Sequence, residues 1–224
     1  MEYNIKRASK SDVFQDLRDK ILKEDLPQGF SLIERELSET YGISRTPMRE
    51  ILWNLMADGV VEQRPSQGFF VRKLDWKQIF EIYQTREAVE GMAARLASQR
   101  QSETLMEQLR NLIEELEAIN VAHDSSEGVR IGRQMHKIII DAASNRFLYE
   151  FYEKLSNLAV LTSNLAVKSI DIENKSKGHH LKIMRSIVNG EEQESENSMR
   201  EHLQITCRNL VHMLYPSIFP RDGT

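Results

Sequence analysis

The sequence predicts a mainly α-helical protein, with an N-terminal winged helix-turn-helix followed by a C-terminal all-α bundle of six helices. Apolar residues recur at helical spacing along most of the chain, which indicates helices that bury one face. Residues up to 72 also include a β-type segment punctuated by proline and glycine, whereas residues 75–215 contain no proline. We therefore predict two domains, at 1–73 and 74–224.

Composition excludes several classes of protein. The 224 residues are 40% hydrophobic, which favours a buried core over global disorder. Because no run of about 18 apolar residues occurs and the N-terminus lacks a secretory signal, we expect a cytoplasmic protein that does not contact a membrane. The single cysteine, Cys207, cannot form an internal disulfide or a cysteine-based zinc site. The net charge of −4 provides no global basic field, so DNA binding would depend on local placement of cations.

Three helices are expected in the first domain. The first covers about residues 9–24, where apolar residues recur at helical spacing. Ser31 and Glu34 are spaced as a capping box, which would open the second helix. The third helix is expected to begin with Thr46 as its N-cap and Pro47 in its first helical position.

A β-hairpin is expected after these helices. Two short apolar runs, at 60–64 and 69–72, flank the turn sequence PSQG at 65–68. Three helices followed by a hairpin are typical of a winged helix-turn-helix, whose third helix enters the major groove of DNA.

Arginines gather where such a fold meets DNA. Arg45 and Arg49 lie one turn apart at the N-terminal end of the third helix, on the face opposite its apolar residues. Arginine at this end of a recognition helix can read guanine through two hydrogen bonds, and Arg35 on the preceding helix could reach a phosphate. The alternative is a set of surface salt bridges with three nearby glutamates, Glu34, Glu36 and Glu50.

Residues 26–72 resemble the GntR family of bacterial transcription regulators. The resemblance is carried by LSETYGISRTPMRE at 37–50 and GFFVR at 68–72, without gaps. It implies operator contacts by the arginines and a wing tip that enters the minor groove. The DNA-facing residues implied in this way are Arg35, Ser44, Arg45, Thr46, Arg49, Ser66, Gln67 and Gly68.

The second domain reads as six helices, near 75–100, 102–121, 127–143, 146–168, 174–189 and 191–214. A plain bundle that only dimerises is one interpretation. Polar residues on inward faces argue against it, because His136, His180 and His202 each share a face with apolar residues on three different helices. Imidazoles from facing helices can converge on one metal ion.

The sequence around these histidines resembles the FCD effector domain of the FadR subfamily, and six helices suggest its VanR-like branch. The matching segments are GRQMH at 132–136, ASN at 143–145, HLKI at 180–183 and MREH at 199–202. The resemblance implies a divalent metal held by the three histidines and one aspartate. Three histidines alone can still bind zinc or nickel.

Gly132 stands where that aspartate is expected, one turn before His136. We therefore expect weaker metal binding and an open coordination position, with Gly132→Asp restoring a fourth ligand. The alternative is that the histidines bind an effector directly, without metal.

Arg86 and Asn145 are candidate effector ligands. Arg86 shares an inward face with apolar residues and could clamp a carboxylate, or it could simply pair with Glu90 at the rim of the domain. Asn145 could cap the helix that follows it, and by resemblance it lies near the pocket.

The predicted function is a homodimeric, DNA-binding transcriptional regulator, a repressor that leaves its operator when a small organic acid or sugar acid binds. Two-fold symmetry is expected because one winged helix buries too little surface for specific binding. A metal-free sensor of acyl ligands, like FadR, is the alternative. A histidine–metal enzyme is disfavoured because no HExxH-type motif supplies a general base.

Overall fold

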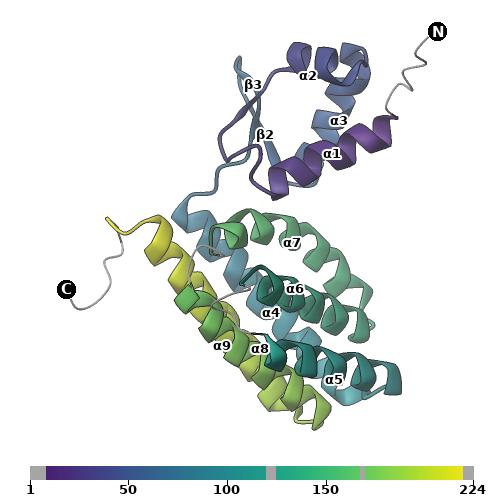
Figure 1. Cartoon of the computed structure of the whole chain (residues 1–224), viewed down its shortest axis with the longest axis vertical. Helices are drawn as coiled ribbons and strands as arrows, with labels where there is room; N and C mark the ends of the chain where they lie inside the picture. The colour runs from purple at the N-terminus through teal and green to yellow at the C-terminus, as the bar shows by residue number, and fades with distance from the viewer. Residues whose placement is uncertain (1–8, 120–124, 167–169, 219–224) are drawn as a thin grey trace. The chain divides into compact units, whose positions relative to one another are not determined.

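The computed structural model describes residues 9–119, 125–166 and 170–218 (Figure 1). Within these ranges the chain forms nine helices and three short strands, which confirms the predicted fold class. The chain divides into two compact units between Leu74 and Asp75.

The N-terminal unit consists of α1 (Lys10–Leu22), β1 (Ser31–Leu32), α2 (Glu34–Tyr41), α3 (Arg45–Ala57), β2 (Val61–Arg64) and β3 (Gly68–Val71). The predicted hairpin is present as β2 and β3, which are antiparallel. β1 adds to the other side of β3, so the sheet order is β1-β3-β2. β1 was not predicted from the sequence.

Two predicted helix starts are wrong. Ser31 does not cap α2, because it lies in β1 and pairs with Phe70 of β3. The N-cap position of α2 is Ile33, which makes no side-chain capping bond. α3 begins one residue before Thr46, with Ser44 at its N-cap, so Thr46 already lies inside the helix.

The core of the N-terminal unit fixes the direction of α3. α1 packs against α3 through apolar faces, and Gly42, at φ +64°, makes the left-handed turn between α2 and α3. This packing turns the opposite face of α3, with Arg45 and Arg49, to the surface. The nearly inaccessible side chains of this core include Val13, Leu17, Ile21, Met48, Ile51, Leu52 and Leu55.

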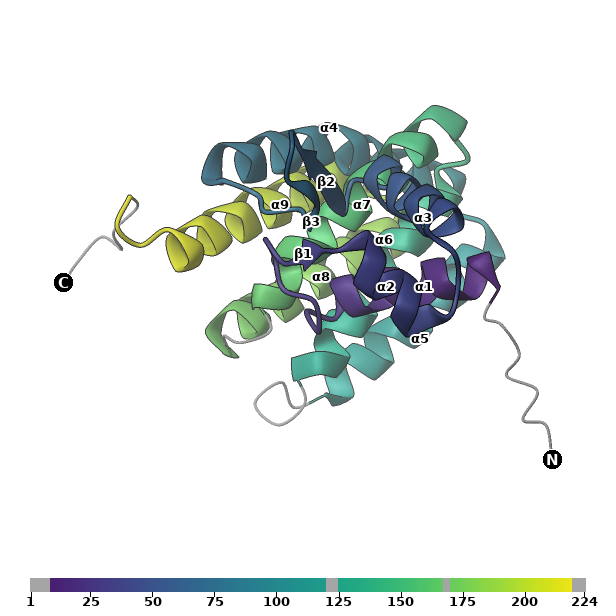
Figure 2. The same ribbon diagram turned by 90° about the horizontal axis from the view of Figure 1, so that it is seen from above.

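The described part of the C-terminal unit forms the six helices α4 (Trp76–Arg100), α5 (Glu103–Ala118), α6 (Ser125–Ala142), α7 (Arg146–Ala166), α8 (Ile170–Val188) and α9 (Glu192–Leu214). α4 packs against α6, α7, α8 and α9, and its contact with α9 is the most extensive between two helices of the unit (Figures 1 and 2). It opens with a capping box in which the side chains of Asp75 and Gln78 each accept a bond from the other's backbone N–H. Among the described residues, no helix combines the length and apolarity needed to cross a membrane.

Candidate functional site

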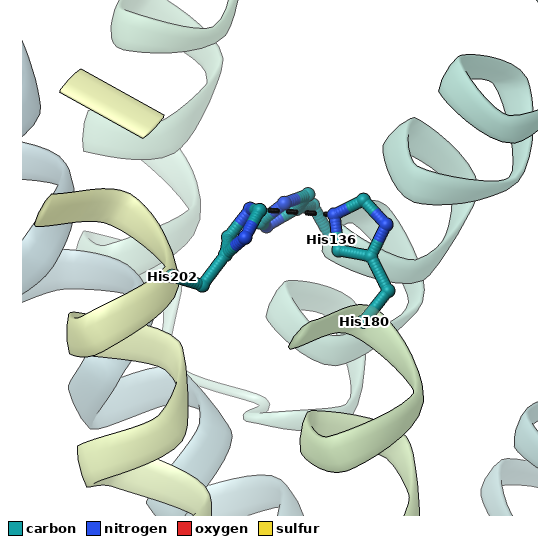
Figure 3. Close-up of side chains that lie close together, drawn as sticks. All are labelled: His136, His180 and His202. Atoms are coloured by element: carbon teal, nitrogen blue, oxygen red, sulfur yellow. Dashed lines mark hydrogen bonds between the residues drawn. The ribbon is translucent and has the colours of Figure 1, made fainter. Parts of the chain in front are cut away.

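Three buried histidines from three helices meet inside the C-terminal unit (Figure 3). His136 comes from α6, His180 from α8 and His202 from α9, and one ring nitrogen of each lies within 4.8 Å of the others. The Nε2 atoms of His180 and His202 are 3.3 Å apart. Each histidine occupies an inward position of its helix, so packing of the three helices brings the rings together.

Burial disfavours the charged forms of His180 and His202. Loss of hydration, together with the nearby His136, lowers the pKa of His180 to about 3. Loss of hydration and the neighbouring His180 also lower the pKa of His202 well below its ordinary value. A neutral imidazole offers a lone pair, and imidazole nitrogens suit Zn²⁺ and Ni²⁺. The donor set therefore fits a divalent ion with three protein ligands and open positions for others.

A buried ion pair on α4 lies beside the histidine centre. Nε of Arg86 donates to Oε1 of Glu90 at 2.6 Å, and the other carboxylate oxygen lies 2.5 Å from Nδ1 of His136. Neither that oxygen nor that nitrogen has a hydrogen-bond partner of good geometry among the described residues. Burial alone would raise the pKa of Glu90, but the charge of Arg86, together with the contact with His136, lowers it to about 2. Glu90 is thus an ionised carboxylate directly behind a candidate metal ligand.

Glu90 contacts His136 as well as Arg86, whereas the sequence suggests only the pair with Arg86. A rim position was one interpretation of Arg86 and Glu90, yet only 8% and 2% of their surfaces are exposed. A carboxylate that holds the second nitrogen of a histidine is a common support of metal-binding histidines. The four-residue spacing of Arg86 and Glu90 predicts their ion pair, but it does not predict the contact between Glu90 and His136.

The structure changes what is expected of the substitution Gly132→Asp. A Cβ atom built at Gly132 would lie 2.4 Å from Cε1 of His180 and 3.0 Å from its Nδ1. The ring of His180 therefore occupies the space that a side chain at this position would need. Gly132→Asp cannot simply add a fourth ligand, because the substitution must first displace His180, one of the other three.

A partly open cavity of about 110 Å³ adjoins the histidine centre. None of the described residues that line it is acidic. An engineered apolar cavity of about 150 Å³ accepts benzene, so the sheltered part of this one has room for an ion and a few heavy atoms of a ligand. Besides the three histidines, its polar lining residues are Tyr83, Arg86, Arg133, Tyr152, Ser156, Ser176 and Thr206.

Asn145 is not brought to this cavity. Its side-chain oxygen accepts bonds from the backbone N–H groups of Phe147 and Leu148, at 3.1 and 3.3 Å, at the start of α7. Asn145 is absent from the described lining of the cavity. The geometry supports the capping role and offers nothing for the predicted contact with an effector.

The predicted DNA-facing residues lie on the surface of the N-terminal unit. All are exposed except Gly68, which is partly covered. A groove of about 300 Å³ runs between the starts of α2 and α3 and the wing, and its lining includes Arg35, Arg45, Gln67 and Gly68. Residues far apart in the sequence therefore share one concave surface that can follow a DNA backbone.

The two arginines of α3 differ in their partners. Arg49 forms a forked pair with Glu34 of α2, with Nη2–Oε2 at 2.8 Å and Nε 3.0 Å from each oxygen. This is one of the salt bridges considered as the alternative to DNA contact. Within the described ranges, neither Arg45 nor Arg35 makes an ion pair.

The wing tip is a tight turn. Ser66 and Gly68 have φ angles of +60° and +98°, in the left-handed region that few side chains adopt. No heavy atom lies within 4 Å of a Cβ built at Gly68, so space does not require glycine there. The positive φ favours glycine there instead, and the turn is closed by a bond from the N–H of Gln67 to the carbonyl of Arg64 at 3.1 Å.

Comparisons with known proteins agree with both units. Residues 9–71 match the bacterial regulatory proteins of the gntR family, and residues 81–205 match the FCD domain. The HTH-type transcriptional regulator YdhC of Bacillus subtilis (strain 168) is 24% identical over 202 residues, 90% of each chain. A protein named as a probable D-xylose utilization operon transcriptional repressor, from Paenarthrobacter nicotinovorans, is 27% identical over 207 residues, 91% of each chain.

A solved structure shares the fold. E. coli McbR/YncC aligns with a TM-score of 0.75 at 22% identity, covering 92% of this chain and 99% of that one. The FCD match covers more than half of the chain, and the family consists of transcriptional regulators rather than enzymes. The chain therefore belongs to the GntR family of bacterial regulatory proteins, with an FCD domain as its C-terminal unit.

Proposed function

We propose that this regulator is a homodimeric repressor that leaves its operator when a small carboxylate binds in the C-terminal cavity. The observation that carries the proposal is the cavity, with arginine, hydroxyl and imidazole groups and no described carboxylate in its lining. Such a lining favours an anion. A repressor is also what the name of the Paenarthrobacter nicotinovorans relative states for that protein. Such a protein would act in the cytoplasm, where bacterial DNA lies.

The N-terminal unit would supply the DNA contacts. Arg45 and Arg49 would reach guanine edges in the major groove, and Arg35 would contact a phosphate. The exposure of all three and the groove shared by Arg35 and Arg45 support this assignment. The remaining contacts are assigned to Ser44 and Thr46 at the start of α3 and to Ser66, Gln67 and Gly68 at the wing tip.

The C-terminal unit would bind the effector together with a divalent ion. His136, His180 and His202 would hold zinc or nickel, which would attract an anionic oxygen. Arg86 lines the cavity, and among the described residues only Glu90 accepts a hydrogen bond from it. Its terminal NH2 groups can therefore bind the effector carboxylate.

The alternative regulator, a metal-free sensor of acyl ligands, fits the cavity less well. An acyl chain would have to extend beyond this cavity of about 110 Å³ through its opening. Histidines that bind a small acid directly remain compatible with that volume. Elemental analysis of the purified protein distinguishes the metal-dependent proposal from both metal-free alternatives, because the proposal expects about one zinc or nickel ion per chain.

A second copy of the chain is the proposed partner, because a palindromic operator needs two reading heads. Phe147 and Phe151 lie one turn apart on α7 with 71% and 55% of their surfaces exposed. We assign this aromatic pair to the dimer interface. Sedimentation of Phe147→Ser/Phe151→Ser is expected to show monomers where the unmodified protein shows dimers.

The test of the function couples both units. Purified protein selects its operator from a random DNA library, and a thermal-shift screen of small organic acids with nickel identifies ligands. The selected ligand is expected to weaken operator binding about 5- to 150-fold in fluorescence anisotropy. Ligands that stabilise the protein yet leave operator affinity unchanged would contradict effector control.

A further inference from the structure

Helix α3 carries an exposed tryptophan. Trp53 has 51% of its surface accessible to solvent, whereas the other tryptophan, Trp76, is partly buried and packs edge-on against Phe80, with 6.2 Å between ring centroids. Within the described ranges, the indole of Trp53 makes no hydrogen bond and no aromatic contact. A large apolar ring with an unused N–H donor is a side chain that interfaces favour. The DNA contacts assigned to the start of α3 do not use it.

Trp53 lies on the face of α3 that bears the assigned DNA contacts. Thr46, Arg49 and Trp53 are spaced by three and four residues, so their side chains follow one side of the helix. A shallow groove beside α3 is lined by Lys10, Thr46, Arg49, Glu50, Trp53 and Asn54. The groove therefore continues the surface assigned to DNA toward the C-terminal end of α3.

The position of Trp53 along α3 corresponds to the rim of a major groove. At a rise of about 1.5 Å per residue, Trp53 lies about 12 Å beyond Arg45 along the helix axis. The major groove is about 8.5 Å deep, and recognition helices contact base edges with their N-terminal residues. With Arg45 and Arg49 at the bases, the side chain of Trp53 is therefore expected at the level of the sugar-phosphate backbone.

The charges in this shallow groove are compatible with a phosphate. Glu50 is the one acidic residue in its described lining, and Glu50 forms an ion pair with Lys10 at the start of α1. Arg49 lines the groove as well, whereas its partner Glu34 does not. Cations therefore outnumber carboxylates beside the indole of Trp53.

We infer that Trp53 is a further DNA contact, which binds the sugar-phosphate backbone at the edge of each half-site. The inference rests on the proposed function, because it requires α3 to be the recognition helix. The indole N–H donates to a phosphate oxygen, and the apolar ring covers a deoxyribose. Lys10 neutralises Glu50, which would otherwise repel that phosphate. Because backbone contacts carry no sequence information, Trp53 strengthens binding to operator and to unrelated DNA alike.

The test measures the affinity of full-length Trp53→Ala for the selected operator and for DNA of unrelated sequence, by fluorescence anisotropy at one low salt concentration. We expect both affinities to fall about tenfold, as for the loss of a hydrogen bond to a charged group, so that their ratio stays constant. Arg45→Ala should instead lose mainly operator affinity, which lowers the ratio. Trp53→Phe keeps a ring and removes only the N–H donor, so it should lose part of both affinities.

Phe30→Ala is the matched control. It removes another exposed aromatic ring, 44% accessible, from the same unit and outside the described lining of the two grooves that border α3 and contain Arg49 or Arg45. Neither affinity should change in this variant, and the melting temperature should not move in either alanine variant, because both rings are exposed. Equal losses of affinity in Phe30→Ala and Trp53→Ala would overturn the contact.

A second measurement reports the environment of the indole directly. In a Trp76→Phe background, Trp53 is the one tryptophan of the chain, and saturation with operator should reduce the quenching of its fluorescence by acrylamide. Unchanged quenching, or unchanged affinities in Trp53→Ala, overturns the contact, and the assignment of α3 stands if Arg45→Ala has lost operator binding. A loss of affinity for the operator alone overturns the backbone contact, because the ring then reads bases. Retained operator affinity in Arg45→Ala overturns the recognition helix itself.

Discussion

Each unit of the molecule contains an arginine paired with a glutamate, and the two pairs differ mainly in burial. In the N-terminal unit, the side chains of Arg49 and Glu34 are 61% and 23% exposed. In the C-terminal unit, those of Arg86 and Glu90 are 10% and 2% exposed. The exposed pair can exchange its partner for DNA at little cost, because water and salt already screen it. The buried pair cannot be opened without leaving a charge unpaired in the core.

An arginine–glutamate ion pair therefore serves a different purpose in each unit. Glu34 can hold Arg49 while DNA is absent and release it when a base or phosphate arrives. Glu90 instead fixes the wall of a cavity, because Arg86 and His136 lie on either side of its carboxylate. Substitutions in the first pair should therefore change DNA binding, and substitutions in the second should change stability.

The largest expected effect is on stability, from Glu90→Ala. Removing one partner of a buried pair leaves Arg86 charged and unpaired, which typically costs about 3–5 kcal/mol. Glu34→Ala should leave the free energy of unfolding nearly unchanged. Trp53 and Trp76 lie in different units, so a Trp53→Phe background leaves one tryptophan that reports on the C-terminal unit during urea unfolding. Equal losses of unfolding free energy in Glu90→Ala and Glu34→Ala would contradict the distinction between the two pairs.

The next effect is on DNA binding and should leave stability alone. Arg45→Ala or Arg49→Ala is expected to weaken operator binding about 10- to 100-fold if each arginine reads a guanine. Fluorescence anisotropy at fixed salt measures this loss, and the melting temperature should not move because both side chains are exposed. Retained affinity in both variants would contradict the assignment of α3 as the recognition helix.

The next prediction is that the stability of the C-terminal unit depends on pH, whereas that of the N-terminal unit does not. His180 keeps a pKa of about 3 in the fold and regains about 6.5 when unfolded. The unfolded chain therefore binds more protons below pH 6.5, and stability falls as the pH falls. Between pH 7.5 and 5 this histidine alone removes about 2 kcal/mol.

That pH effect is measured by urea unfolding of the chelator-treated protein in the Trp53→Phe background. The folded-state pKa of Glu90 is about 2, so its carboxylate contributes little above pH 5. His180→Gln should flatten the pH dependence, and the N-terminal unit, which has no histidine, should not show it. An unchanged slope in His180→Gln would mean that this histidine is accessible to protons in the fold.

Helical periodicity was enough to predict the helices, because that signal is local in the sequence, whereas the capping residues predicted for α2 and α3 were wrong. The strand β1 was not predictable in this way. It has two residues, and Ser31 joins the sheet only because Phe70 lies beside it in the folded chain. By contrast, the convergence of the three histidines was predictable, because each of them occupies an inward position of its helix. The contact of Glu90 with His136, and the ring of His180 over Gly132, depend on how three helices pack and leave no local signal.

The smallest expected effect tests whether Glu34 competes with DNA for Arg49. Glu34→Gln keeps a hydrogen-bond acceptor but removes the charge, so operator affinity should rise about two- to fivefold, as for the loss of one surface ion pair. Asp58→Asn is the control, because it removes one negative charge at the other end of α3, where Asp58 lies 3.5 Å from Arg18. A general charge effect would raise affinity equally in both variants. Weaker binding by Glu34→Gln would show that the carboxylate orients Arg49 for its base, in which case the exposed pair positions a side chain as the buried pair does.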